Sequence, residues 1–186
     1  MSPTAFPTPH AIELPVRHAL FAATWRLRGA RGTDEPALRA LYASTREDEL
    51  AAAPWPPAVT AAFLDHQFAL QHHHYVTHFP EADFLVIESP DGIAGRLYRE
   101  RVPEGAPAGE CDAVIDVCLL PAWRRRGVGT SLLRAVMEEA TGRGRGVALQ
   151  VLARNDGARR LYERLGFAVS ATNGAHLAMR WRAAPG

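Results

Sequence analysis

The segment Arg124–Thr130, with the sequence RRRGVGT, separates two stretches of opposite character. Ala113–Leu120 before it is apolar and rich in β-branched residues, which predicts a buried strand. The chain is therefore predicted to pass from a buried strand, through a glycine- and arginine-rich turn, into an amphipathic helix. After the turn, apolar residues recur at helical spacing, at Val128, Leu132, Leu133, Val136, Met137 and Ala140.

Such a turn is suited to binding phosphate. Glycine lets the backbone approach a ligand closely, and the first turn of a helix presents unpaired N–H groups and a partial positive charge. A Walker A loop is excluded, because no Lys-Ser/Thr pair follows a second glycine at the required spacing. A dinucleotide fingerprint is disfavoured, because Gly127-x-Gly129 lacks a third glycine and the next strand ends at Gln150–Leu152 without an acid for a ribose.

Two segments together carry a family resemblance. The first is Arg124-x-x-Gly127-x-Gly129, and the second is Asn155-x-x-Ala158-x-x-Leu161-Tyr162-x-x-Leu165-Gly166-Phe167. In this order, separated by about one strand with its connections, they resemble the GNAT superfamily of acyl-CoA-dependent N-acyltransferases. The match covers about residues 112–168. The resemblance implies an α/β (α+β) fold: one domain with a mixed central sheet of about six to seven strands, a parallel pair at the cofactor site and helices on both faces.

At 186 residues the chain is long enough for one domain with a substantial core. Residues 1–23 are proline-rich and are predicted to be a flexible or loosely docked extension. Residues 24–182 are predicted to form the GNAT-like acyltransferase domain, and 183–186 a tail. Periodicity and turn signals predict strands at 24–28, 84–88, 93–98, 113–120, 146–152, 167–171 and 176–181, and helices that begin near 33, span about 59–79, span 128–141 with Gly142 as the stop, and end at Gly166.

The charge balance gives no sign of a polyanionic partner. The chain has 21 Lys and Arg against 20 Asp and Glu, a net charge of +1, so no nucleic acid or membrane partner is expected. No apolar run reaches the roughly 20 residues of a membrane helix, and the amino terminus does not match a secretory signal. Cys111 and Cys118 form neither a disulfide framework nor a metal motif, which favours a reducing, cytoplasmic location.

The resemblance implies coenzyme A, carried as acetyl-CoA, as the cofactor. Its diphosphate is expected to bind backbone N–H groups of residues 124–130, while the arginine side chains hold phosphates or remain solvated. Leu119 and Leu120 are expected to meet the pantetheine arm through backbone groups where the two parallel strands separate. Asn155 either contacts the cofactor or caps its own helix. The predicted cofactor-binding set is Leu119, Leu120, Arg124, Arg125, Arg126, Gly127, Val128, Gly129, Thr130, Asn155 and Ala158.

Two residues are candidates for proton transfer. Tyr162 lies on the apolar stripe of its helix, where a tyrosine ordinarily packs, but the resemblance places its hydroxyl near the cofactor sulfur as an acid for the leaving thiolate. Asp116 lies inside an apolar strand, where a carboxylate must be paired or neutralised. It is either the base for the amine, directly or through water, or a structural carboxylate. Glu110 and Asp112 are weaker candidates for the base.

Candidate acceptor-binding residues lie in the amino-terminal half. The helix over about 59–79 places Gln71 and Tyr75 on one face with Gln67 beside it, an arrangement suited to a polar cleft. Glu47, in a charged run, would recognise a cationic amine or belong to a solvated surface. His74 and His78 have the spacing of a zinc pair, but a third ligand is missing, so the histidines are taken as exposed and no metal is predicted.

The sequence thus predicts transfer of an acetyl group from acetyl-CoA to a primary amine on a small-molecule or peptide acceptor. Direct transfer in a ternary complex is expected, because neither cysteine lies beside an obvious base. A catalytically silent acyl-CoA-binding regulatory domain would carry the same cofactor motifs and stays as the alternative, with a nucleotide-dependent oxidoreductase more distant. A homodimer is compatible with the sequence.

Overall fold

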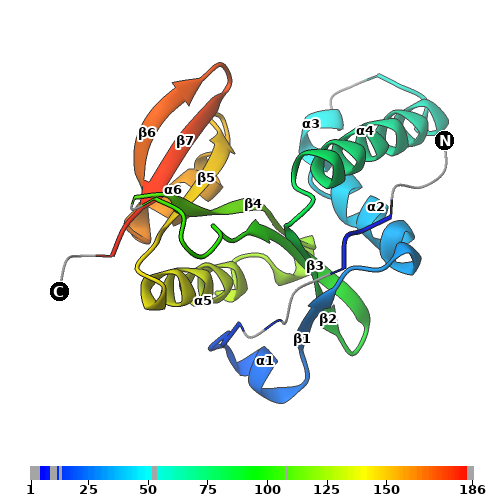
Figure 1. The fold of residues 1–186 in the computed structure, drawn as a ribbon. Helices are drawn as coiled ribbons and strands as arrows, with labels where there is room; N and C mark the ends of the chain where they lie inside the picture. The colour runs from blue at the N-terminus through cyan, green and yellow to red at the C-terminus, as the bar shows by residue number, and fades with distance from the viewer. Residues whose placement is uncertain (1–4, 9–11, 13, 52–53, 108, 184–186) are drawn as a thin grey trace.

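The computed structural model describes residues 5–8, 12, 14–51, 54–107 and 109–183. Its strands form one seven-stranded mixed sheet in the order β1-β2-β3-β4-β5-β7-β6 (Figure 1). The strands are β1 Arg26–Gly29, β2 Asp83–Ser89, β3 Gly92–Glu100, β4 Cys111–Leu119, β5 Gly146–Leu152, β6 Ala168–Asn173 and β7 His176–Trp181. The helices are α1 Ala19–Ala23, α2 Glu35–Ala43, α3 Glu47–Leu50, α4 Pro57–His78, α5 Val128–Gly142 and α6 Asp156–Arg164, with short 3-10 turns η1 Gly32–Asp34 and η2 Pro121–Trp123.

Two apolar clusters lie on opposite faces of the sheet, which confirms helices on both faces. On one face, α5 packs Leu132 and Leu133 among strand residues such as Leu97. On the other face, α2 and α4 pack Leu41 and Phe68 together with residues of β2 and β3. Figure 1 shows α5 on one side of the central strands and α4 on the other.

Most predicted elements form, with differences at their ends. The expected stop of α5 at Gly142 is wrong, because the helix includes Gly142 and the left-handed residue is Gly144, at φ +67°. The Arg145 N–H donates to the Ala140 carbonyl at 2.8 Å, which closes the helix after this turn. The short helices α1 and α3 were not predicted, because segments of four or five residues are too short to show a periodicity.

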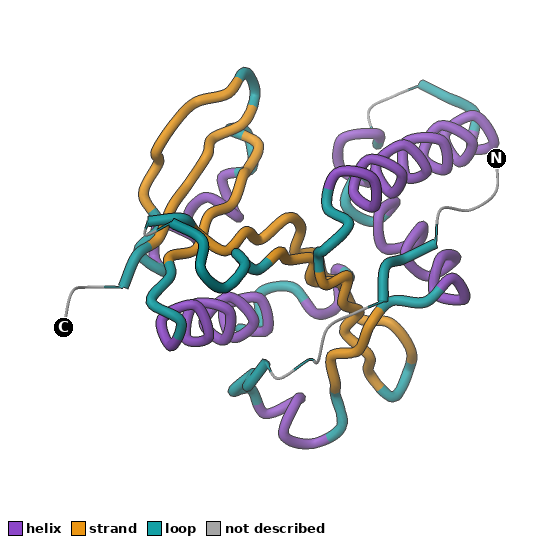
Figure 2. Tube along the Cα trace, viewed as in Figure 1, coloured by secondary structure: helices purple, strands orange, loops and turns teal. Residues whose placement is uncertain are grey.

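The parallel pair is confirmed, and it covers only part of each strand. Cys111–Val114 of β4 pairs with Gly146–Leu149 of β5. Beyond that point β4 continues beside β3 as far as Leu119, while β5 continues beside β7 as far as Leu152. The two strands therefore separate after Val114, and Figure 2 shows them diverging.

A β-bulge lies where this separation begins. Val114 pairs with Arg99 and Asp116 pairs with Tyr98, so Ile115 is an extra residue on β4. Val114 and Val117 belong to the α5 cluster, whereas Ile115 belongs to the α4 cluster. If β4 kept all its residues in a regular strand, strict alternation from Val114 would place Asp116 on the α5 face. The bulge instead turns Asp116 toward α4.

The segment before β1 packs on the α5 face of the sheet. Leu20 and Phe21 of α1 contact the apolar cluster, and a row of rings continues through Trp25 to Trp123, with centroid distances of 5.9 Å and 4.7 Å. Within the described residues, no helix combines the length and apolarity needed to cross a membrane.

Candidate active site

The turn between β4 and α5 has the geometry of an anion site. Gly127 precedes the helix in the left-handed conformation, at φ +82°, and the first bond of the helix runs from the Ser131 N–H to the Gly127 carbonyl at 3.0 Å. Within the described chain, the N–H groups from Arg125 to Thr130 have no backbone acceptor. Arg124 is not part of this set, because its N–H donates to the Pro121 carbonyl at 3.2 Å. The available donors therefore begin at Arg125.

The three arginine side chains of the turn lie in different surroundings. Arg124 was expected to hold phosphate or remain solvated, and this is wrong: its Nε donates to the Leu119 carbonyl at 2.8 Å and its Nη2 to the Ser44 carbonyl at 3.1 Å. Arg124 thus ties the end of β4 to the end of α2. Arg125 and Arg126 are both exposed, and Arg126 lies over the Trp123 ring, 5.1 Å from its centroid. Arg125 is the member of the triplet with a side chain suited to meeting phosphate.

The end of β4 offers fewer free backbone groups than predicted. The Leu120 N–H donates to Ala94 and its carbonyl accepts from Trp123, both at 2.9 Å, so Leu120 is not available to a cofactor. Since backbone groups alternate along a strand, the Leu119 N–H faces the opposite edge, toward the gap. Leu119 is therefore the residue of the predicted pair that lies at the unpaired edge.

Helix α6 carries the second predicted segment. The Asn155 side chain accepts from the Ala158 N–H at 3.1 Å, which is the capping role. Tyr162 is buried, with 7% of its surface exposed, and its ring lies 5.9 Å from that of Phe167. Burial, and secondarily the negative charge of Asp116, raises the pKa of Tyr162 to about 12. This coupling links α6 to Asp116 across the separated strands.

A buried ion pair fixes Asp116. Arg96 on β3 donates from Nη2 to Asp116 Oδ2 at 2.5 Å and to Gln71 Oε1 at 2.7 Å. Tyr75 donates to the same Oδ2 at 3.4 Å. Among the described residues nothing donates to Oδ1, and the Asp116 side chain is 17% exposed. The structure thus brings together Asp116, Gln71 and Tyr75, and adds Arg96. The position of Arg96 within the mainly apolar run Ile93–Tyr98 was the available sequence signal.

Two acceptor candidates remain: Gln67 lies one helical turn before Gln71 on α4, whereas Glu47 lies on α3. Gln67 is half-buried on α4, and Glu47 is exposed at the start of α3. Within the same acidic run, Glu49 pairs with Arg46 at 2.8 Å and with Arg154 at 3.2 Å. The Glu49–Arg154 contact joins α3 to the loop between β5 and α6, on opposite sides of the separated strands.

Among the histidines of α4, which were predicted to be exposed, His73, His74 and His78 are exposed and His72 is not. His72 is buried, with its ring 4.7 Å from Phe6 and stacked at 6.0 Å on Phe68. It shares the buried face of α4 with Phe68 and Val76, at intervals of one helical turn. The described part of the chain holds no group of three or more potential metal ligands.

Cys118 lies near the Asp116–Arg96 pair on the same face of β4. Burial first, and then the charge of Asp116, raises the pKa of its thiol to about 12. The thiolate is the reactive form of cysteine, so Cys118 is a poor nucleophile at neutral pH. Both cysteines are free thiols.

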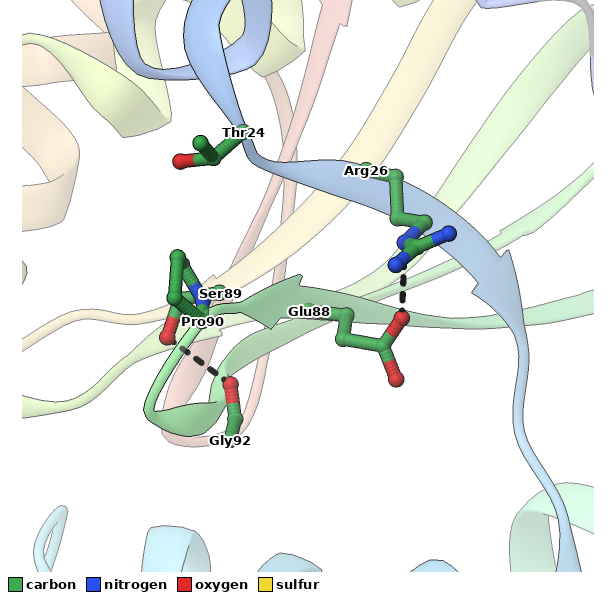
Figure 3. A pocket seen from close by; sticks show the side chains of 6 residues that line it. All are labelled: Thr24, Arg26, Glu88, Ser89, Pro90 and Gly92. Carbon is green, nitrogen blue, oxygen red and sulfur yellow. Dashed lines mark hydrogen bonds and ion pairs between the residues drawn. The ribbon is translucent and has the colours of Figure 1, made fainter.

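A pocket of about 530 Å³ lies at the margin of β1 and the β2–β3 turn (Figure 3). It is lined by Thr24, Arg26, Glu88, Ser89, Pro90 and Gly92. Figure 3 shows Arg26 paired with Glu88 across the neighbouring strands, at 2.9 Å. None of these six is a predicted site residue, and the ion pair already neutralises the charges there. The turn between β4 and α5, not this pocket, is the better candidate for the chemistry.

Comparison with known proteins agrees with this geometry. Residues 38–167 match the acetyltransferase (GNAT) family. The fold is similar to PaiA N-acetyltransferase from Thermoplasma acidophilum in complex with coenzyme A, at 14% identity over 86% of this chain and 99% of that chain, with a TM-score of 0.64. It is also similar to RimL, a ribosomal alpha-N-protein acetyltransferase, at 18% identity over 97% and 100%, with a TM-score of 0.60.

A third similar structure is NAA60 of Arabidopsis thaliana in complex with a bisubstrate analogue, at 16% identity over 86% of this chain and 98% of that chain, with a TM-score of 0.53. Among curated protein sequences, none matches. At these identities the solved structures establish the fold, while the family model spans more than half of the chain. This protein belongs to the GNAT family of acetyltransferases.

Proposed function

We propose that the protein transfers an acetyl group from acetyl-CoA to the primary amine of an acceptor while both are bound. The observation that carries the proposal is the row of amides from Arg125 to Thr130, which have no backbone acceptor among the described residues. They lie at the start of α5, next to the point where β4 and β5 separate. Amide donors and the positive end of a helix favour a diphosphate. The left-handed Gly127 lets the backbone make the turn that presents them. The residues present therefore fit coenzyme A.

Other groups at the gap fit the rest of this molecule. Acetyl-CoA, when bound, would supply the acetyl group as a thioester and leave as the coenzyme A thiol. The Leu119 N–H and the neighbouring edge of β4 are suited to an amide-bearing arm, since an unpaired strand edge accepts such a chain by β-strand addition. The exposed Arg125 side chain would supply charge to a phosphate.

Tyr162 is the proposed hydrogen-bond donor to the leaving thiolate. Its pKa of about 12 lies well above the value of about 8.5 for a thiol, so complete proton transfer would be unfavourable by roughly 5 kcal/mol. Tyr162 therefore stays protonated and stabilises the thiolate by donating a hydrogen bond. This refines the role expected from an unperturbed phenol.

Asp116 is the proposed partner of the acceptor amine. Arg96 and Tyr75 hold its Oδ2, which fixes the carboxylate and leaves Oδ1 directed elsewhere. With Oδ2 held by Arg96, Oδ1 is the oxygen proposed to accept a hydrogen bond from an ammonium group or a proton through water. Gln71, held by Arg96, lies on the same side and would help to orient the acceptor.

Direct transfer is favoured over a covalent enzyme intermediate. Cys118, the thiol closest in sequence to Asp116, is held in its protonated form by a pKa raised to about 12. The bisubstrate analogue in the similar NAA60 structure joins two substrates in one molecule, which suits a mechanism with both bound at once. The acceptor is proposed to be a small molecule or a peptide, and the protein is proposed to act in the cytoplasm.

The test is calorimetry with coenzyme A, together with thiol release from acetyl-CoA against a panel of amines. The matched variants are Gly127→Ala and Gly144→Ala, which place a side chain at left-handed glycines at the two ends of α5. A left-handed residue costs roughly 1–2 kcal/mol with a Cβ, so Gly127→Ala should weaken coenzyme A binding about tenfold while Gly144→Ala leaves it unchanged. No binding by the wild type at millimolar ligand would refute the proposal, and binding without thiol release from any amine would favour a regulatory domain.

A further inference from the structure

Residues before the matched family region contact the anion-binding turn directly. His18, the residue that precedes α1, lies with its Nε2 3.0 Å from the Arg126 carbonyl oxygen. A Cβ placed on Gly127 would lie 3.6 Å from the same nitrogen, so the imidazole covers one side of this glycine. The family match begins at residue 38, and His18 is therefore outside the part of the chain that defines the family.

The contacts of His18 fix its tautomer. Its Nδ1 accepts from the Leu20 N–H at 3.2 Å, which caps α1. A carbonyl oxygen only accepts hydrogen bonds, so Nε2 must carry the proton and donate to Arg126. Capping of α1 explains the contact of Nδ1 but not the contact of Nε2. The second bond, to a residue 108 positions away, has a separate consequence for the turn.

That consequence follows from the geometry of one peptide unit. The Arg126 carbonyl and the Gly127 N–H belong to the same planar trans peptide, so they point in opposite directions. A peptide next to glycine is easily reoriented, because glycine tolerates both signs of φ. By holding the carbonyl on its own side, His18 keeps the Gly127 N–H pointing to the other side, among the free donors of the turn.

We propose that His18 is a positioning residue for the diphosphate of coenzyme A, and that the amino-terminal segment is thereby part of the cofactor site. The inference rests on the proposed function, since it assumes that the turn binds this diphosphate. A pre-oriented donor loses less freedom on binding, so the expected effect is on affinity for the cofactor and not on the chemical step.

The experiment compares coenzyme A dissociation constants, measured by calorimetry, for the wild type and three variants, with melting temperatures measured in parallel. His18→Asn keeps a strong capping residue for α1 but is too short to reach Arg126. Losing one hydrogen bond and the orientation it imposes should weaken binding about fivefold, with the melting temperature nearly unchanged. His18→Gln, which retains an N–H donor at a similar reach, should recover most of the affinity.

Arg17→Ala is the control on the same segment. It removes an exposed ion pair with Glu138 of α5 at 2.7 Å, and should leave the dissociation constant unchanged. Equal affinities for wild type and His18→Asn, or equal losses in His18→Asn and Arg17→Ala, would overturn the inference. Failure of the wild type itself to bind would instead overturn the proposed function. If turnover is found, His18→Asn should raise KM for acetyl-CoA without lowering kcat.

Discussion

Strand β4 carries two aspartates, Asp112 and Asp116, that each pair with an arginine. Asp112 lies where β4 is hydrogen-bonded to β5, and its two oxygens accept from the Val102 N–H and from Arg143, each at 2.9 Å. Its side chain is 5% exposed. Asp116 lies beyond Val114, the last residue of β4 that pairs with β5. It is 17% exposed and receives its described hydrogen bonds on one oxygen only.

The difference shows what separates a structural carboxylate from a candidate site. Both side chains are largely buried and both have a counter-charge, so neither property distinguishes them. Both oxygens of Asp112 accept hydrogen bonds, which join the loop after β3 to the end of α5. Asp116 keeps one oxygen without a described donor, next to the gap left by β5. The distinguishing property is an unused acceptor beside an unpaired strand edge.

The largest expected effect comes from replacing each aspartate with asparagine. Either change leaves an arginine without its counter-charge, and removing one partner of a buried pair costs about 3 kcal/mol or more of unfolding free energy. Only Asp116→Asn should also lower kcat of the folded protein, by about 10³-fold. Urea unfolding and steady-state rates measure the two effects. An equal loss of kcat in Asp112→Asn would remove the distinction between the two residues.

Tyr162→Phe should give the next largest effect, since Tyr162 senses the charge of Asp116. Loss of one preorganised donor to a developing anion typically costs about 10²-fold in kcat. The dissociation constant for coenzyme A should remain the same, because the hydroxyl is not among the groups proposed to bind the diphosphate. Full activity in Tyr162→Phe would remove this residue from the mechanism while leaving the cofactor site in place.

Titration of Tyr162 at alkaline pH should distinguish the effect of Asp116 from that of Asp112. The folded protein raises the pKa of Tyr162 to about 12, from about 10 for a free tyrosine. The protonated phenol therefore contributes stability that is complete below about pH 10 and is lost as the pH rises to about 12. Asp116→Asn should move the tyrosinate titration to lower pH, whereas Asp112→Asn should not. Tyr162→Phe identifies the absorbance change that belongs to this residue.

The smallest expected effect concerns the ion pair that crosses the gap. Arg154 and Glu49 are 68% and 39% exposed, and a surface pair of this kind contributes about 1 kcal/mol at most. Arg154→Ala should leave the melting temperature nearly unchanged and alter KM for the acceptor within about fivefold. A large fall in kcat would mean that the Glu49–Arg154 contact helps to hold the catalytic groups around Asp116 in place, and does not only affect binding of the acceptor.

Sequence patterns predicted those parts of the site that are determined by neighbouring residues in the chain. Glycine spacing and helical periodicity located the turn at Gly127, the helix α5 and the position of Tyr162, and the strand–helix–strand order gave the parallel pair. The partners of Arg124 and Asp116 could not be predicted, because they come from other elements. Ser44 lies 80 positions from Arg124, and Arg96 meets Asp116 through the pairing of β3 with β4.

The bulge was also beyond sequence reasoning, for a related reason. An extra residue is defined only against the neighbouring strand, and no periodicity within Ala113–Leu120 marks Ile115 as the residue without a partner. Regular alternation would have assigned Asp116 to the wrong face. The sequence thus predicted the strand on which Asp116 lies. Its neighbours could be identified only from the pairing of the strands in the sheet.

The extra residue, Ile115, also bears on which property of the sequence makes β4 separate from β5. Omitting Ile115 would restore regular pairing with β3 without turning any later side chain over, because Ile115 and Asp116 both lie on the α4 side. The backbone would lose its local bend, and with it the departure from β5. The separation of β4 from β5 therefore depends on chain length and not on side-chain identity. A scan of point substitutions would miss it, whereas a single-codon deletion would expose it.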